Sequence, residues 1–109
     1  MSTKEFGPVF KQPDFRVSNR YFLMLAKVSS GPDNRLGIVV GKKNVARAVQ
    51  RNRIKRMIRE TFRLRKSEFA TIDLVVLARK GVDQFASGDI HDQLDLLLDE
   101  LALRLGAHT

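Results

Sequence analysis

The chain has 109 residues, with 20 Lys and Arg against 12 Asp and Glu, and so a formal net charge of +8. This length suits a single domain, and a hydrophobic fraction of 43% is enough for a packed core. The absence of cysteine excludes a disulfide framework, a thiol redox site and a thiolate zinc site.

No apolar run approaches the roughly 18 residues that a membrane-spanning helix needs. Residues 1–15 also lack the apolar segment of a secretory signal. We therefore expect a cytoplasmic protein that forms one domain over residues 1–109 and has no membrane partner.

In chain order, the sequence predicts a short helical turn, two strands, a long helix, a third strand and a second long helix. Apolar patterning and turn residues place these elements at residues 3–10, 20–28, 35–41, 51–65, 72–79 and 89–105. The strands are almost continuously apolar, which implies a sheet covered on at least one face. The expected fold class is an α/β (α+β) two-layer sandwich in the order α-β-β-α-β-α.

Helical spacing predicts how each long helix packs. At 100° per residue, the apolar stripe of the first long helix spans an arc of about 140° and consists of Ile54, Met57, Ile58, Thr61 and Phe62. Val45 and Val49 are out of phase with this stripe, so we expect a break or a separate turn near Gln50. In the second long helix we expect Asp89 as the N-cap and Gly106 as the terminator.

The net charge is concentrated in one segment. Residues 42–66 hold eleven basic residues and one acid, Glu60, for +10, whereas the rest of the chain holds nine basic and eleven acidic residues, for −2. A solvated helix face usually mixes the two signs. A face of one sign favours a polyanionic partner, and the excess of Arg over Lys favours phosphate. We therefore expect this helix to bind nucleic acid.

Two other groups of residues permit alternatives. Five of the eight aromatic residues lie within residues 6–22, where they could stack on the bases of a single strand or pack in the core. Asp92, Asp95 and Asp99 share one face of the last helix, which would suit a self-sufficient two-metal nuclease, although a solvated face is the simpler interpretation. Composition alone equally permits a ribosomal protein or a general RNA chaperone without a role in cleavage.

A longer pattern resembles one known family. The segments LGIVVGKK (36–43), AVQRNRIKR (48–56), RETFR (59–63) and DLVVLARK (73–80) are similar, in this order, to those of the bacterial ribonuclease P protein subunit. Phe6 and Val9-Phe10 match the Phe-x-x-Val-Phe pattern of that family, and the Arg-Asn-Arg run at 51–53 is its hallmark. The resemblance extends from Glu5 to Leu105.

The resemblance implies both a fold and a role. The implied fold has a left-handed β-α-β crossover, as in the second domain of a small-subunit ribosomal protein. The implied role is to bind a catalytic RNA and the 5′ leader of precursor tRNA, while that RNA removes the leader with bound Mg²⁺. Neither DNA nor a membrane is an expected partner.

The resemblance also implies which residues do this work. It assigns no catalytic residue and no metal ligand to the protein. The residues that it places against RNA are Lys42, Lys43, Arg51, Asn52, Arg53, Lys55, Arg56, Arg59 and Arg63. The residues that it places in the leader-binding cleft are Phe6, Phe10, Leu23 and Leu25.

Overall fold

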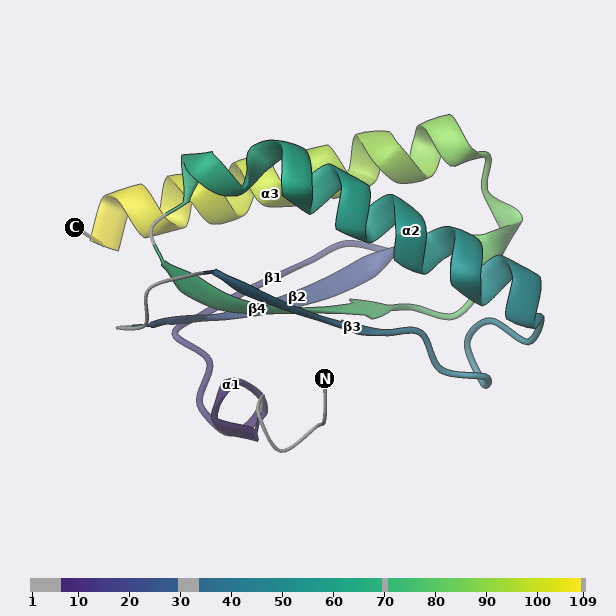
Figure 1. Cartoon of the computed structure of the whole chain (residues 1–109), viewed down its shortest axis with the longest axis horizontal. Coiled ribbons are helices and arrows are strands. Elements are labelled where there is room, and N and C mark those ends of the chain that lie inside the picture. Colours follow the sequence, from purple (N-terminus) through teal and green to yellow (C-terminus); the bar gives the residue numbers. More distant parts are fainter. Residues whose placement is uncertain (1–6, 30–33, 70, 109) are drawn as a thin grey trace.

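The computed structural model describes residues 7–29, 34–69 and 71–108. Its helices are α1 (Gly7–Lys11), α2 (Ala48–Arg65) and α3 (Ser87–His108), and its strands are β1 (Phe15–Ser18), β2 (Phe22–Val28), β3 (Arg35–Val39) and β4 (Ile72–Ala78). Two short 3-10 turns, η1 (Lys66–Glu68) and η2 (Val82–Gln84), follow α2 and β4. The two long helices form a layer on one face of the sheet, and α1 lies against the other face (Figure 1). The α/β sandwich is therefore confirmed.

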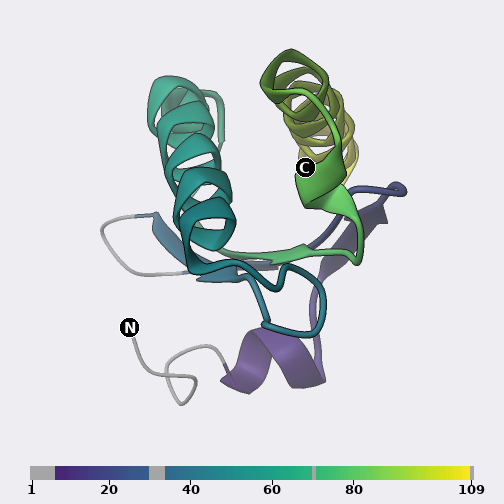
Figure 2. The same cartoon turned by 90° about the vertical axis from the view of Figure 1, so that its right-hand side faces the viewer.

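The four strands pair in the order β1-β2-β4-β3. β2 is antiparallel to both of its neighbours, whereas β3 and β4 are parallel. Parallel neighbours need a crossover connection, and α2 supplies it. β3 lies in front of β4 with α2 above the sheet, so the crossover is left-handed (Figures 1 and 2). This confirms the implied handedness, although about 98% of such crossovers are right-handed.

The central strands send alternate side chains to two hydrophobic cores. Phe22 and Met24 of β2 belong to the main core beneath α2 and α3. Leu25 belongs to a small second core beneath α1, together with Val9 and Val75. Both faces of the sheet are thus covered, which explains why β2 and β4 are almost continuously apolar.

β1 is a strand between α1 and β2 that was not among the predicted elements. The backbone N–H of Asp14 donates to the carbonyl of Ala26 at 2.9 Å, next to the first pair of the β1–β2 ladder. At the other end, the side-chain oxygen of Asn19 accepts from the N–H groups of Tyr21 and Phe22, both at 2.8 Å. This side-chain turn closes the hairpin. Pairing with β2 therefore defines β1, which is too short to show a pattern of its own.

The expected break near Gln50 was wrong, because α2 is continuous from Ala48 onward, but a separate turn does precede the helix at residues 42–44. Val49 is 75% exposed, whereas Val45 is fully buried in the turn that precedes the helix. The N–H of Val45 donates to the carbonyl of Gly41 at 2.9 Å within that turn. The change of phase that the two valines indicate thus falls before the helix and not inside it.

The two predicted ends of the last helix were also wrong. α3 begins at Ser87, ahead of Asp89, and the N–H of Ile90 donates to the carbonyl of Ala86 at 3.1 Å. It continues through Gly106, because buried Leu105 keeps the last turns packed on the core and a glycine inside a helix costs only about 1 kcal/mol.

The remaining predicted elements agree within two residues at each strand end. Of the helical turn predicted at residues 3–10, only residues 7–10 are described, and they belong to α1. No helix in the described part of the chain combines the length and apolar character needed to cross a membrane.

Candidate nucleic-acid interface

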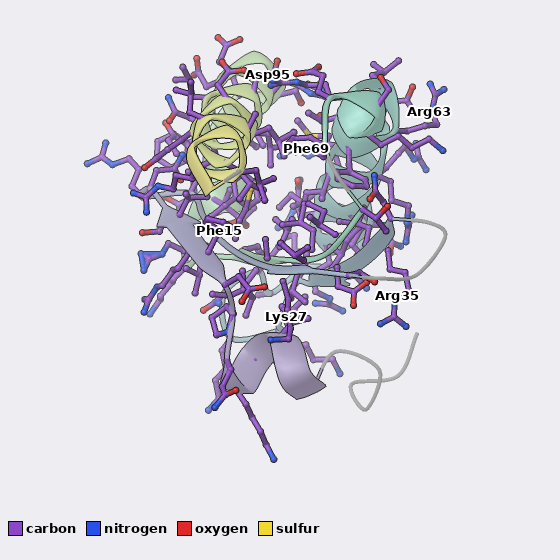
Figure 3. The ribbon with its side chains drawn as sticks, turned by 90° about the vertical axis from the view of Figure 1, so that its left-hand side faces the viewer. Phe15, Lys27, Arg35, Arg63, Phe69 and Asp95 are labelled. Atoms are coloured by element: carbon purple, nitrogen blue, oxygen red, sulfur yellow. The ribbon has the colours of Figure 1, made fainter. Side chains whose placement is uncertain are left out.

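α2 is amphipathic, and its buried stripe is the one that helical spacing predicts. Five of its residues are buried: Ile54, Met57, Ile58, Thr61 and Phe62. The ring of Phe62 stacks on that of Phe69 with 6.0 Å between centroids, and Figure 3 shows Phe69 pointing into the space between the helices and the sheet. This packing fixes the rotation of α2 and leaves its opposite side in solvent.

The outer side of α2 carries cations that have no partner among the described residues. Arg56 and Arg59 are exposed, and Lys55 is half-buried. None of their side chains forms a hydrogen bond or ion pair with any residue that the structure describes. Arg59 lies three residues from Arg56 and four from Lys55, which are the spacings at which like charges repel on a helix. A bound polyanion would relieve that repulsion. Asn52 is exposed on the same side.

Arg63 differs from these cations because it has a carboxylate beside it. Its Nη2 donates to Oε1 of Glu60 at 2.5 Å, and its Nε donates to Oε2 at 3.4 Å. The hydrogen bond from Arg63 lowers the pKa of the Glu60 carboxyl. Both side chains are exposed, and Figure 3 shows Arg63 projecting from α2 on the side away from α3. An exposed pair of this kind is weak because water screens it, so a phosphate could replace Glu60.

Arg51 and Arg53 turn their guanidinium groups back toward the protein. Nη1 of Arg51 donates to the carbonyls of Val45 and Ala46 at 3.1 and 2.8 Å. Nη1 of Arg53 donates to Oγ of Ser87 at 2.6 Å. Both arginines remain partly exposed, so they add positive charge to the surface while they bind neighbouring segments.

The turn before α2 adds three exposed cations, Lys42, Lys43 and Arg47. Arg47 is the N-cap residue, makes no side-chain capping bond, and is followed by a first turn without an acidic residue. The positive end of the helix dipole is therefore not offset there, and it adds to the charge of the three side chains.

The described residues that are predicted to line the leader-binding cleft lie on the second face of the sheet and on α1. Val9 of α1, 1% exposed, packs against Leu25 and Val75. Leu25, at 8% exposure, is thus covered by α1, whereas Leu23 beside it is half-buried and Phe10 is 39% exposed. Phe6 lies outside the described residues. The structure therefore leaves Phe10 exposed and Leu23 partly exposed, and it places Leu25 beneath the helix.

The acidic side of α3 is partly engaged in contacts with α2. Nη2 of Arg65 contacts Oδ1 of Asp99 at 2.5 Å, and its Nη1 lies 3.5 Å from Oδ1 of Asp95 and donates to the backbone carbonyl of Asp95 at 2.9 Å. No group of three His, Cys, Asp or Glu residues in the described ranges is arranged to hold a metal ion. Two of the three carboxylates considered for a nuclease site thus bind a guanidinium of the same chain.

The chain matches known proteins over almost its whole length. The family model for Ribonuclease P matches residues 1–102. The chain belongs to the ribonuclease P protein family. The Ribonuclease P protein component of Pseudomonas aeruginosa is 42% identical over 101 residues, which are 93% of this chain and 75% of the relative. That of Acinetobacter baylyi is 40% identical over 97 residues, which are 89% of this chain and 74% of the relative.

Solved structures of ribonuclease P proteins share the fold. The RNase P protein of Staphylococcus aureus has a TM-score of 0.84 and 33% identity, and the match covers 93% of this chain and 92% of that one. The RNase P protein of Thermotoga maritima, solved with 1-(4-fluorophenyl)-2-thiourea, has a TM-score of 0.75 and 32% identity. This match covers 87% of this chain and 92% of that one.

Membership of the ribonuclease P protein family confirms the resemblance seen in the sequence. The chain is the protein component of a ribonucleoprotein enzyme of tRNA processing, and such a component acts with an RNA subunit. Val75 and Leu77 also lie on the α1 face, although neither was among the residues predicted for the leader-binding cleft. Their alternation with Leu74 and Val76 along β4 was the available signal.

Proposed function

We propose that this chain binds the catalytic RNA of ribonuclease P through the outer side of α2, and the 5′ leader of precursor tRNA through the α1 face of the sheet. The observation that carries the proposal is the set of three cations on α2, Lys55, Arg56 and Arg59, whose side chains have no partner among the described residues. Phosphate contacts of this kind position RNA without reading its sequence.

The arrangement of the two surfaces supports simultaneous binding of both RNAs. α2 lies on one face of the sheet, and α1 lies on the other (Figure 2). The exposed side chain of Phe10 belongs to α1. A protein between the two RNAs would hold the leader in a constant position relative to the catalytic RNA. Its cations would also neutralise phosphates that otherwise need bound magnesium. The exposed ring of Phe10 offers a surface for base stacking.

We further propose that the RNA subunit holds the Mg²⁺ and carries out the cleavage. Magnesium bound there would activate the attacking water and stabilise the charge that develops on the phosphate. The residues of this chain then bind and orient RNA, and no step of bond cleavage is assigned to them.

Reconstitution tests the proposal directly. Cleavage of precursor tRNA is measured across a magnesium series with the catalytic RNA alone, with the RNA and this protein, and with the protein alone. The protein should lower the magnesium concentration that the RNA requires and should cleave nothing by itself. Cleavage by the protein alone would indicate a self-sufficient nuclease. An unchanged magnesium requirement would contradict a role in the holoenzyme.

A further inference from the structure

α1 is attached to the sheet by apolar packing and by the segment that follows it. Val9, 1% exposed, packs on Leu25 and Val75, whereas the neighbouring Phe10 is 39% exposed. A helix of five residues has little stability of its own. The position of the Phe10 ring therefore depends on the contacts that hold residues 12–14 to the sheet.

Asp14 fixes the chain where it passes from α1 into β1. Its backbone N–H donates to the carbonyl of Ala26 at 2.9 Å, and its Oδ2 accepts from the N–H of Val28 at 2.8 Å. The carboxylate thus adds one bond to the β1–β2 ladder beyond Phe15, the residue at which β1 begins. Hydrogen bonds to a charged acceptor are stronger than those to a neutral one, so this bond resists a shift of the segment along β2.

Lys27 of β2 holds the same segment from the sheet side. Its Nζ donates to the backbone carbonyl of Gln12 at 3.2 Å and lies 4.0 Å from Oδ1 of Asp14. Figure 3 shows this side chain directed from the sheet toward α1. Gln12 directly follows α1, and lysine is a common partner for the carbonyls that a helix leaves free at its end. Lys27 and Asp14 together therefore tie the end of α1 to β2.

The neighbour of Lys27 on β4 does not compete for its ammonium group. Asp73 lies opposite Lys27 in the β2–β4 register, but both oxygens of its carboxylate accept from Arg35, at 2.9 and 2.8 Å. No ion pair joins Lys27 to Asp73 in the part of the chain that the structure describes. The ammonium group of Lys27 is thus left to bind the segment that follows α1.

We infer that Asp14 and Lys27 are positioning residues for the 5′ leader. They hold α1 over Leu25 and keep the ring of Phe10 at the surface of the α1 face, where a base of the leader would stack. A ring that is already in place has less freedom to lose when the RNA binds, and affinity is higher for that reason. The inference rests on the proposed binding of the leader by the α1 face, and it adds two polar residues that were not predicted for the cleft.

The charge of Asp14 makes this inference easy to separate from simple electrostatics. Asp14→Ala removes a negative charge, so a purely electrostatic effect would tighten the binding of any RNA. Loss of the bond to Val28 should instead weaken the binding of the leader. Lys27→Met removes the ammonium group and keeps most of the apolar stem. Lys11→Met is the matched control, because Lys11 is an exposed lysine of α1 that forms no hydrogen bond or ion pair with any described residue.

The assay is direct binding of leader-bearing precursor and of mature tRNA to the complex of each variant with the catalytic RNA. Binding is measured over a salt series, well below the thermal midpoint of the variant. Asp14→Ala and Lys27→Met should each weaken precursor binding by about 3- to 10-fold, because the ring is present but less well placed. Both should spare mature tRNA, and Lys27→Met should keep the wild-type slope of log affinity against log salt. Lys11→Met should lose less precursor affinity than Lys27→Met.

A double-mutant cycle with Phe10→Ala tests whether the two residues act through the ring. If they act by placing Phe10, Asp14→Ala should cost little further affinity for the precursor once the ring is gone. The losses from the two substitutions should therefore not add. A merely structural role of Asp14 would give the same loss with and without the ring.

Four results would overturn the inference. Tighter precursor binding in Asp14→Ala would indicate an electrostatic effect, or a leader that binds only after α1 has moved away. A slope lower by about 0.7 in Lys27→Met, or an equal loss in Lys11→Met, would indicate contact with a leader phosphate. Wild-type precursor affinity in both folded variants would show that their bonds serve stability alone. Additive losses in the cycle would show action independent of Phe10. If Phe10→Ala itself leaves precursor binding unchanged, the proposed leader site has failed as well.

Discussion

Replacing Arg65 with Met tests how α2 is held against α3. The Arg65 side chain is 16% exposed and bonds to Glu68 through Nε at 3.0 Å and Nη2 at 2.8 Å, besides its contacts with Asp95 and Asp99. The hydrogen bond to Glu68 is the largest cause of the raised pKa of Arg65. Methionine keeps much of the apolar stem, so the change isolates the lost charge interactions.

The structure also sets the size of this effect. The carboxylate partners of Arg65 are about half exposed, so each contact is worth about 1 kcal/mol and not the larger value of a buried pair. Three partners give about 2–3 kcal/mol. With an unfolding entropy near 2.1 cal/mol/K per residue, this loss lowers the thermal midpoint by about 9–13 °C.

Thermal unfolding followed by circular dichroism measures this loss, with Arg63→Met as the control. Among the described residues Arg63 has only the exposed partner Glu60, so its variant should lose much less stability than Arg65→Met. Added salt should narrow the difference between wild type and Arg65→Met because it screens exposed charges. Equal losses in the two variants would refute the view that the Arg65 cluster joins the helices.

Two further predictions concern the α1 face of the sheet. The two hydrogen bonds from Arg35 lower the pKa of Asp73. The free energy that they contribute to folding is therefore present above the ordinary pKa of Asp. It is lost as the pH falls through the lowered pKa. Asp73→Asn should therefore cost about 1–2 kcal/mol near pH 7 and flatten the acid limb of a plot of unfolding free energy against pH. An unchanged acid limb would contradict this. Phe10→Ala should weaken binding of leader-bearing precursor by about 1–3 kcal/mol and spare mature tRNA in a direct binding assay. Equal losses for the two RNAs would instead indicate damage to the packing of α1.

The sequence alone predicted the parts of the fold that depend on periodicity. The five buried residues of α2 follow from helical spacing, because one apolar stripe of that period can face only one core. β1 could not be found in this way, since Phe15 and Val17 are too few to establish alternation and the strand depends on its pairing with β2.

The position of the candidate site could be predicted from the sequence, but the contacts of its individual arginines could not. Charge concentration and the family pattern both indicated α2, and the outer side of this helix is exposed in the structure. They could not distinguish Arg53, which bonds to Ser87, from Arg56, which has no partner among the described residues, because those partners come from the far end of the chain. In the same way, Leu25 lies beneath α1 because Val9 covers it, which no local pattern in β2 shows.

The central claim is that the outer cations of α2 bind the phosphates of the catalytic RNA. Its most direct test is the salt dependence of that binding for the wild type and for the double variant Arg56→Ala/Arg59→Ala. Neither side chain has a partner in the described structure, so the variant should unfold at the wild-type temperature. Its slope of log affinity against log salt should be smaller by about 1.4–1.8, the sum for two phosphate contacts. A slope equal to that of the wild type would contradict the claim.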